Sequence, residues 1–323
     1  MNHSINKNPT VSVSMAVYNA EQFVAETVES ILAQTFIDFE FIIIDDGSTD
    51  RSLKILETYA VKDKRIRLIS RQNKGISRTR NEMLSQAKGE FIAVMDADDI
   101  ALPERLAHQV EFLQREPNIV CVSSAYKVID ARGRLLTCLT PPEHNDEIQK
   151  FILAGHAAVW HPCAMFRRTA AMEVGGYEEA MPSAHDLDLW LKLGEVGQLQ
   201  NLQEILLKYR LHNNSISEQL GLRQRKEARE ACERAWKRRG IEGHFEASKP
   251  WRPTKERHSQ YYFMLKYGWW AFNNGQRQTA MLYGRRAIAS LPFNLKGWKL
   301  LACATFKQLP NNGIKTPVVK HAR

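Results

Sequence analysis

Pairs of carboxylates follow two apolar runs in the sequence. Asp45 and Asp46 come directly after "FEFIII", and Asp96 and Asp98 come after "FIAVM". Like charges that gather in one place disfavour each other's ionisation unless a positive group joins them. Mg²⁺ and Mn²⁺ prefer oxygen ligands and are often held by one or two carboxylates together with substrate phosphates. If both runs end at one place in the fold, the acids predict a divalent cation and a phosphate-bearing ligand.

The elements that carry these acids alternate between strand and helix patterns. Strand-like runs at 11–17, 39–44, 66–70 and 91–95 are separated by stretches with apolar residues at helical spacing. The helices are expected at 21–34, 51–60, 76–87, 104–115 and 218–239, and a further strand at 119–126, before a hairpin around "DARGR". The alternation predicts an α/β fold with a parallel sheet and helices on both faces. Ligands of such sheets bind beyond the carboxyl ends of the strands, where the acids lie.

Charge divides unevenly along the chain. The 323 residues have a formal net charge of +9, yet residues 221–323 hold 22 lysines and arginines against 6 aspartates and glutamates. The remainder holds 23 basic against 30 acidic residues. Five of the seven tryptophans also lie in the basic third. This asymmetry predicts two modules with different partners, and the β-like texture ends near residue 217.

Cysteine usage and hydropathy indicate the compartment. The five cysteines are scattered and form no C-x-x-C pair, so neither a disulfide framework nor a zinc site is indicated. A reducing compartment is the simplest interpretation. The N-terminal residues lack an apolar core long enough for a signal peptide, and polar residues interrupt every later apolar run. We therefore expect a cytoplasmic protein, which can also lie peripherally on the inner face of the membrane.

Seven blocks in order carry a family resemblance. They are "VSVSMAVYNAEQFVAETVESILAQTF", "FEFIIIDDGSTD", "NKGISRTRNEML", "GEFIAVMDADDIALPERL", "HPCAMFRR", "GGYEEAMPSAHDLDLWLKL" and "YRLHNNSIS". In order and approximate spacing they resemble the family 2 glycosyltransferases of GT-A fold. The resemblance implies a GT-A catalytic domain at 1–217, a mostly parallel sheet flanked by helices, followed by a basic, Trp-rich helical region at 218–323.

The resemblance also implies how the nucleotide of a sugar donor is bound. Asp46 should contact the base, with Ala16 and Tyr18 at the end of the first strand lining the same pocket. Arg78 and Arg80 are candidates for phosphate or base contacts, because guanidinium groups bind phosphate oxygens bidentately. At least one of these two arginines is expected to be solvent-exposed.

A metal site is implied by the D-x-D signature at residues 96–98. Asp98 is the expected direct ligand of Mn²⁺ or Mg²⁺, while Asp96 contacts the ribose, the metal or a metal-bound water. His212 matches a histidine that approaches the diphosphate or the metal, although a structural loop histidine is an equal alternative. Asp45 is expected to orient its turn, and Asp99 to lie in a solvated turn before Pro103.

An inverting transfer needs one base that accepts the proton of the attacking hydroxyl. By resemblance this base is Asp186 in "AHDLDLW", where His185 departs from the usual glutamate and can alter the pKa of Asp186 or contact the acceptor. Asp188 is the alternative base, on a different helical face. His161 is expected to be structural, and Trp160 and Trp190 to be core or cleft-wall residues.

The basic last third allows several interpretations. Small residues and a proline at 268, 275, 280, 287 and 292 resemble the spacing of one tetratricopeptide repeat, whose two helices would pack closely. The alternative is a plain helical hairpin on the catalytic domain. "YYFMLKYGWWAF" can instead lie on an anionic membrane surface. We expect helical packing first, membrane contact second, and no nucleic acid, because no nucleic-acid motif is present.

The leading hypothesis is a metal-dependent inverting glycosyltransferase. It would move a hexosyl or N-acetylhexosaminyl group from a nucleotide-sugar, typically a UDP-sugar, to a glycan or lipid-linked acceptor in surface polysaccharide or lipopolysaccharide synthesis. A nucleotidyltransferase is one alternative, but "VYNAEQF" lacks the expected glycine-rich basic loop after the first strand. A non-catalytic nucleotide-sugar-binding domain is another, and the retained acids argue against it.

Overall fold

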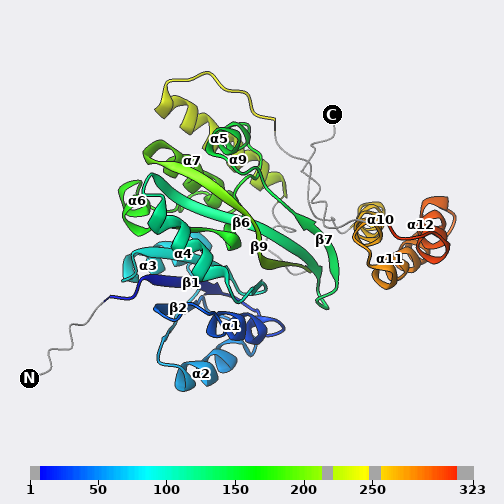
Figure 1. The fold of residues 1–323 in the computed structure, drawn as a ribbon, viewed down its shortest axis with the longest axis horizontal. Helices are drawn as coiled ribbons and strands as arrows, with labels where there is room; N and C mark the ends of the chain where they lie inside the picture. The colour runs from blue at the N-terminus through cyan, green and yellow to red at the C-terminus, as the bar shows by residue number, and fades with distance from the viewer. Residues whose placement is uncertain (1–7, 213–220, 247–255, 311–323) are drawn as a thin grey trace, which may run out of the picture.

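One mixed sheet forms the centre of the molecule (Figure 1). A computed structural model describes residues 8–212, 221–246 and 256–310. Within these ranges the strand order is β3-β2-β1-β4-β8-β6-β9-β5, and β7 pairs with β6. The strands are β1 (Val11–Val17), β2 (Phe39–Asp45), β3 (Ile66–Ser70), β4 (Phe91–Asp96), β5 (Ile100–Ala101), β6 (Ile119–Asp130), β7 (Leu135–Leu139), β8 (Met165–Arg167) and β9 (Gln198–Leu211).

The first half of the sheet is parallel, as predicted. Strand β1 pairs in parallel with β2 and with β4, and β2 pairs in parallel with β3. In this register Ala16 lies opposite both Ile44 and Asp96, and Val17 lies opposite Asp45. The carboxyl ends of β1, β2 and β4 therefore meet at one edge, which brings the acid-bearing segments together. Strand β8 then pairs antiparallel with β4 on one side and with β6 on the other, so the whole sheet is mixed.

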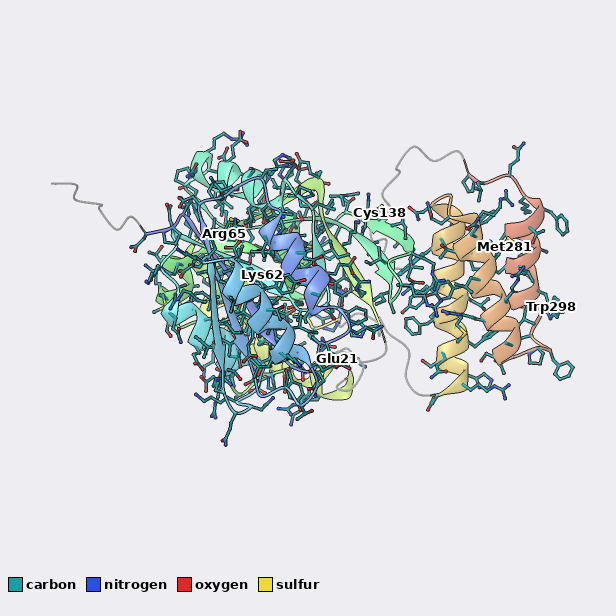
Figure 2. The ribbon with its side chains drawn as sticks, turned by 90° about the horizontal axis from the view of Figure 1, so that it is seen from below. Glu21, Lys62, Arg65, Cys138, Met281 and Trp298 are labelled. Carbon is teal, nitrogen blue, oxygen red and sulfur yellow. The ribbon has the colours of Figure 1, made fainter. Side chains whose placement is uncertain are left out.

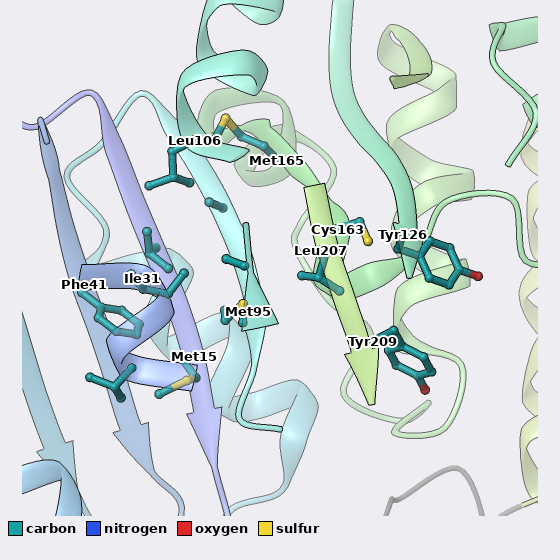
Figure 3. Close-up of a cluster of buried hydrophobic side chains, with 14 of the residues drawn as sticks. Met15, Ile31, Phe41, Met95, Leu106, Tyr126, Cys163, Met165, Leu207 and Tyr209 are labelled. Carbon is teal, nitrogen blue, oxygen red and sulfur yellow. The ribbon is translucent and has the colours of Figure 1, made fainter. Parts of the chain in front are cut away.

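Helices cover both faces of the sheet. They are α1 (Val24–Leu32), α2 (Ser52–Lys62), α3 (Ile76–Gln86), α4 (Arg105–Arg115), α5 (Asn145–Leu153), α6 (Arg168–Glu173), α7 (His185–Val196), α9 (Gly221–Arg239), α10 (Arg257–Asn273), α11 (Arg277–Ser290) and α12 (Leu295–Phe306), with a 3₁₀ turn at His161–Cys163. Helices α1, α2 and α4 pack into one apolar cluster with β1 and β2, part of which is drawn in Figure 3. Helices α3, α5, α6, α7 and α9 pack into a second cluster. Burial on both faces explains why the parallel strands are continuous apolar runs.

Several element boundaries differ from the sequence prediction. Helix α1 begins at Val24 instead of residue 21, because the backbone N–H groups of Phe23 and Val24 both bond the carbonyl of Ala20 in a preceding turn. Strand β6 runs to Asp130, four residues past its expected end, because β9 pairs with it from Ile119 to Asp130 and β7 pairs with its last part, from Tyr126 to Ile129. The predicted domain boundary near residue 217 lies outside the described residues and stays a prediction.

The segment "YYFMLKYGWWAF" forms most of helix α10, and most of its apolar side chains pack inward, whereas Tyr262 is 61% exposed. Tyr261, Phe263 and Leu265 are buried, as expected for helical packing. Gly268 permits this packing, because a Cβ there would lie 2.4 Å from the side chain of Leu300 in α12. Helices α10 and α11 thus form the expected hairpin, to which α12 adds a third helix (Figure 1).

Two hydrogen bonds attach the three C-terminal helices to the β6–β7 hairpin. The Tyr283 hydroxyl donates to the Asp130 carboxylate over 3.2 Å. The Asn274 side-chain amide donates to the hydroxyl of Thr137 over 3.1 Å. Tyr267 and Tyr283 also join the apolar cluster that includes β6 and β7. None of the helices in the described ranges is long and apolar enough to cross a membrane.

Gly89 offers a test of the close packing beside β1. A Cβ at this position would lie 2.4 Å from the backbone nitrogen of Ser12. We expect Gly89→Ala to lower the free energy of unfolding by about 1–3 kcal/mol, because the backbone must shift to relieve the overlap. Urea denaturation measures this change. The exposed neighbour Lys88 supplies the control, since Lys88→Ala should leave the midpoint unchanged; equal midpoints for both variants would contradict the packing.

Candidate active site

Hydrogen bonds join two loops at the carboxyl end of β1. The backbone N–H of Asn19 donates to the Ser48 hydroxyl over 3.0 Å, and the Asn19 side chain accepts from the N–H of Thr49 over 2.7 Å. Asn19 has a φ of 50°, a left-handed conformation in which asparagine is enriched. Asn19 thereby joins the β1–α1 loop to the β2–α2 loop. Tyr18, just before this connection, is 53% exposed, so its ring is accessible to a ligand.

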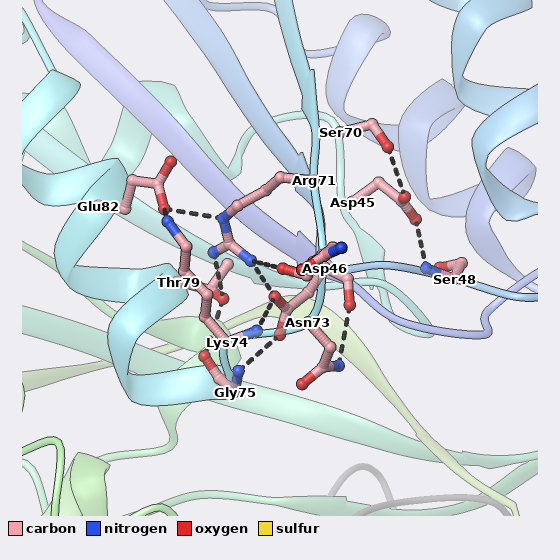
Figure 4. A network of polar contacts seen from close by, with 11 residues as sticks. Asp45, Asp46, Ser48, Ser70, Arg71, Asn73, Lys74, Gly75, Thr79 and Glu82 are labelled. Carbon is pink, nitrogen blue, oxygen red and sulfur yellow. Dashed lines mark hydrogen bonds and ion pairs between the residues drawn. The ribbon is translucent and has the colours of Figure 1, made fainter.

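Asp46 is buried, and its carboxylate fastens the turn at residues 71–75 (Figure 4). Its two carboxylate oxygens accept the backbone N–H groups of Lys74 and Gly75, over 2.8 and 3.0 Å. The Arg71 guanidinium forms an ion pair with the same carboxylate. The Asp46 carbonyl accepts the side-chain amide of Asn73 over 2.8 Å. The carboxylate thus holds a turn in place beside the end of β1.

Arg71 is a site residue that the sequence reasoning missed. Besides Asp46, its guanidinium contacts Glu82 over 2.9 Å and the Thr79 hydroxyl over 2.9 Å. Burial lowers the pKa of Arg71, but the bonds to Asp46 and Glu82 outweigh it, so the pKa lies above its ordinary value. Its position in the sequence could have identified it, because Arg71 directly follows β3 and so lies at the same edge of the sheet as the acids.

Asp45 turns away from Asp46 and holds the loop after β2. One of its oxygens accepts the Ser70 hydroxyl over 3.0 Å, and the other accepts the backbone N–H of Ser48 over 3.4 Å. These contacts agree with the expectation that Asp45 orients its turn.

Arg80 lies beside the carboxylate of Asp96. The Arg80 guanidinium is 3% exposed and donates to Asp96 over 2.5 Å. Burial raises the pKa of Asp96, and the positive charge of Arg80 acts in the opposite direction. Arg78 instead points to solvent and pairs with Glu179 over 2.8 Å. The expectation that one of the two arginines is exposed is confirmed, and only Arg80 lies at the strand edge.

Asp98 contacts His212, which follows β9. The His212 Nε2 lies 2.6 Å from an Asp98 carboxylate oxygen, and the Phe23 ring packs 4.7 Å from the His212 ring. Arg210 donates its Nε to the carbonyl of Asp98 over 2.7 Å and pairs with Glu26 over 2.6 Å. Residues of α1 and β9 therefore position Asp98, and none of Arg210, Glu26 and Phe23 was identified from the sequence.

Asp99 corrects one prediction. We expected it in a solvated turn, but it is fully buried. Its carboxylate accepts the backbone N–H of Arg210 over 2.8 Å, and its carbonyl accepts the Thr27 hydroxyl over 2.8 Å. The expectation was wrong because β9 and α1, which are remote in sequence, close over this turn.

The first turn of α7 carries the candidate bases. Asp186 is half-buried, and its carboxylate accepts the adjacent backbone N–H of Leu187 over 2.8 Å. Asp188 is buried and paired with Lys192 over 2.8 Å. Of the two carboxylates, Asp186 is the more accessible to an acceptor hydroxyl. Burial lowers the pKa of His185, an effect that the charge of Asp186 opposes, so His185 is uncharged near neutral pH.

His161 contacts His185 from the interior, as expected of a structural residue. Its Nε2 lies 3.1 Å from the Tyr177 hydroxyl, and the two imidazole rings lie 5.3 Å apart, edge to face. Burial sets the pKa of His161 well below its ordinary value. Trp190 is a buried core residue, and Trp160 is partly buried and stacks on Tyr126 at 5.0 Å.

The carboxylates offer a partial metal site. In the parts of the chain that the structure describes, no three histidine, cysteine, aspartate or glutamate residues gather closely enough to hold a metal ion by themselves. Asp98 and His212 supply an oxygen and a nitrogen, a donor set that Mn²⁺ accepts, and such ions commonly take further ligands from substrate phosphates. An open cleft of about 820 Å³, lined by Arg134, Arg277 and Arg285 among others, lies elsewhere, between the β6–β7 turn and α11.

Comparisons with known proteins identify the family of the chain. The sequence profile of glycosyl transferase family 2 matches residues 12–175, half of the chain, which therefore belongs to this family. An uncharacterised glycosyltransferase of Methanocaldococcus jannaschii is 36% identical over 210 residues, 64% of this chain and 72% of that protein. A chondroitin synthase of Escherichia coli is 31% identical over 214 residues, 66% of this chain but 31% of that longer protein.

Solved structures confirm the GT-A fold. A mannosyltransferase of Pyrobaculum calidifontis in complex with GDP-Man and Mn²⁺ matches with a TM-score of 0.54 and 18% identity, covering 93% of this chain and 80% of that one. Residues 1–349 of Staphylococcus aureus TarS in complex with UDP-GlcNAc match with a TM-score of 0.53 and 18% identity, covering 91% and 79%. At this identity the likeness concerns the fold alone.

The buried histidines predict how stability depends on pH. The folded chain resists protonation of His161 and His185, so below about pH 6.5 the unfolded chain binds more protons. The free energy of unfolding should fall as pH falls, by up to about 1.4 kcal/mol per pH unit for each histidine. His161→Asn should reduce this slope in urea denaturation, whereas His108→Asn, at an exposed position, should keep it. An unchanged slope in His161→Asn would contradict the assignment.

Proposed function

We propose that this chain is a metal-dependent inverting glycosyltransferase that transfers a hexosyl or N-acetylhexosaminyl group from a nucleotide-sugar, most simply a UDP-sugar. The observation that carries the proposal is the meeting of the ends of β1, β2 and β4, which places Asp46 and Asp96 at one edge. Ligands of α/β sheets bind at such edges. Family membership supports the reaction, and the structural neighbours with GDP-Man and UDP-GlcNAc support a nucleotide-sugar donor.

The donor nucleotide lies, in this proposal, over the end of β1. The exposed Tyr18 ring and Ala16 line the base pocket, and the turn fastened by Asp46 closes its side. Arg80 sits behind Asp96 and supplies buried positive charge, which favours the ionised carboxylate and a nearby ribose contact. Arg78 faces Glu179 at the surface, so its proposed phosphate contact would require that ion pair to open.

Asp98, with Asp96 and His212, would hold a divalent metal. A bound Mn²⁺ or Mg²⁺ neutralises a diphosphate and stabilises the charge that develops on it as a leaving group. The neighbour that contains Mn²⁺ supports a metal of this kind. Arg210 and Phe23 hold Asp98 and His212 in place, which fixes the direction of the carboxylate before ligands bind.

Asp186 would act as the base. Its carboxylate accepts the proton of the acceptor hydroxyl as that oxygen attacks the anomeric carbon, and the bond from this carbon to the diphosphate oxygen breaks. Displacement from the opposite side inverts the anomeric configuration. Asp188 suits this role less well, because Lys192 holds its buried carboxylate. His185, uncharged and adjacent, would contact the acceptor or adjust the basicity of Asp186.

The acceptor in this proposal is a glycan or a lipid-linked sugar in surface polysaccharide or lipopolysaccharide synthesis. The relative named as a chondroitin synthase supports a polysaccharide product. We expect the protein in the cytoplasm or on the inner face of the membrane, where lipid-linked acceptors are exposed. The catalytic domain at 1–217 and the helical region at 218–323 would divide catalysis from acceptor or membrane contact.

Two aspartate variants separate metal binding from base catalysis. Asp186→Asn should reduce turnover about 10²–10⁴-fold while leaving affinity for the donor unchanged, because general base catalysis contributes about this much. Asp98→Asn should abolish the dependence of UDP binding on Mn²⁺. Sugar release from UDP-sugars and calorimetric titration of UDP with and without Mn²⁺ measure the two effects.

The matched control for both variants is Asp146→Asn. Asp146 is an exposed carboxylate on α5, so its loss should change neither turnover nor nucleotide binding. Wild-type turnover in both Asp98→Asn and Asp186→Asn would refute the mechanism. UDP binding without any effect of Mn²⁺, in a protein that releases no sugar, would favour a non-catalytic binding domain.

A further inference from the structure

Large apolar side chains lie exposed along one side of helix α12 and at the corner before it. Phe293 is 98% exposed, Leu295 79%, Trp298 50% and Phe306 85%. The spacing of 295, 298 and 306 places the three helical residues within one arc of the helix surface. We call these four residues the α12 outer face. The opposite side of α12 packs on its neighbours through buried residues that include Leu300 and Ala304.

This face is at the outside of the molecule. Figure 2 shows Trp298 at the edge of the C-terminal helices that is farthest from the sheet. Exposed apolar residues that occur singly need no explanation, but a contiguous group of large ones commonly marks an interaction site. Helix α12 therefore presents its apolar group where a large surface can reach it.

Local bonds hold the corner before α12 in a defined shape. The indole N–H of Trp298 donates to the carbonyl of Pro292 over 2.9 Å. The Asn294 side chain caps the helix by accepting the backbone N–H of Lys296 over 3.1 Å. The backbone that carries Phe293 and Leu295, on either side of the cap, is thus already ordered before anything binds, which limits the entropic cost of binding to their side chains.

Lysines follow the apolar residues around the helix. Lys296, Lys299 and Lys307 are exposed, and each is one residue beyond a member of the outer face. Residues 257–310 contain eight lysines and arginines and no aspartate or glutamate. A helix with tryptophan, phenylalanine and leucine beside lysines matches the pattern of helices that lie in the interface of an anionic bilayer. The absence of acids disfavours a basic partner.

We propose that the α12 outer face binds the surface of an anionic phospholipid bilayer. Phe293, Leu295, Trp298 and Phe306 enter the headgroup and acyl boundary, and the flanking lysines contact lipid phosphates. This proposal concerns a lipid site on α12 and goes beyond the transfer reaction. It assigns membrane contact to α12 and not to "YYFMLKYGWWAF", whose side chains Tyr261, Phe263 and Leu265 are buried.

The candidate active site lies close to the point where helices α10 to α12 attach to strand β6. Tyr283 of α11 bonds Asp130 at the end of β6, and Asp130 is paired in register with Leu211 of β9. The residue after Leu211 is His212, which contacts Asp98. A bilayer bound by α12 would therefore be connected to the candidate active site through two adjacent strand ends, which suits an acceptor held in the same membrane.

Vesicle co-sedimentation of the full chain tests the proposal. We expect binding to vesicles that contain phosphatidylglycerol, little binding to phosphatidylcholine alone, and weaker binding at high salt. Lys296→Gln with Lys299→Gln should reduce the partition coefficient about 25-fold, or about fivefold for each lysine. Leu295→Ser with Phe293→Ser should reduce it at least about tenfold, because two exposed apolar groups lose their contact with lipid.

Matched controls come from the catalytic domain. Ile37 and Val61 are 75% and 88% exposed, and Ile37→Ser with Val61→Ser removes comparable apolar surface. Lys62→Gln with Lys64→Gln removes two exposed lysines. Neither control pair should change vesicle binding. Equal losses in the control and α12 variants would overturn the assignment, as would equal binding to both kinds of vesicle.

A dye reports contact at α12 without reducing binding strongly. All five cysteines are buried, so a thiol-reactive, polarity-sensitive dye should label Leu295→Cys selectively in the folded protein. Its emission should shift to the blue with phosphatidylglycerol vesicles and stay unchanged with phosphatidylcholine. No shift with either vesicle overturns the proposal. A shift that appears without vesicles and grows with protein concentration would show instead that a second copy of the chain covers this face.

Discussion

Neighbouring carboxylates at one edge of the sheet require positive or hydrogen-bonding partners, and the rest of the site follows from how these are supplied. Each acid has its own partner from a different part of the chain. The pairs are Asp46 with Arg71, Asp96 with Arg80, and Asp98 with His212. The partners come from the turn after β3, from α3 and from the residue after β9, so satisfying the acids also fixes those segments around the ends of β1, β2 and β4. The electrostatic requirement thus also specifies the positions of the loops that surround the candidate site.

The sequence was informative where chemistry and periodicity act locally. Continuous apolar runs located β1 to β4, and the rule that parallel strands end together located Asp46 and Asp96 at one edge. The partner of Asp46 was harder to predict, because Arg71 belongs to no periodic pattern or motif. Asp99 was misjudged because its burial depends on β9, more than a hundred residues away. Contacts between segments that are remote in sequence can be predicted only once the fold is known. The end of a strand can be predicted from the residues next to it.

In the C-terminal third, too, one feature could be predicted from the sequence and another could not. Glycine and alanine spacing indicated a close helical hairpin, which α10 and α11 form. Composition alone could not distinguish aromatic residues that pack inward, such as Phe263, from those that face outward, such as Phe293. Basic charge without acids marks the region as a whole, but only the packing of α12 selects which side chains remain outside. The family profile likewise matches residues 12–175, within the α/β domain.

Strand β9 imposes a condition on the evolution of this site. Side chains alternate between the two faces of a strand, so Arg210 and His212 share one side while Leu211 takes the other. Pairing with β6 already includes register shifts near Ala125, before β9 reaches the candidate active site. One inserted or deleted residue between those shifts and His212 would exchange the two sides and leave Asp98 facing a leucine. Loops elsewhere can change length to suit new sugars, but this strand can vary only in its side chains.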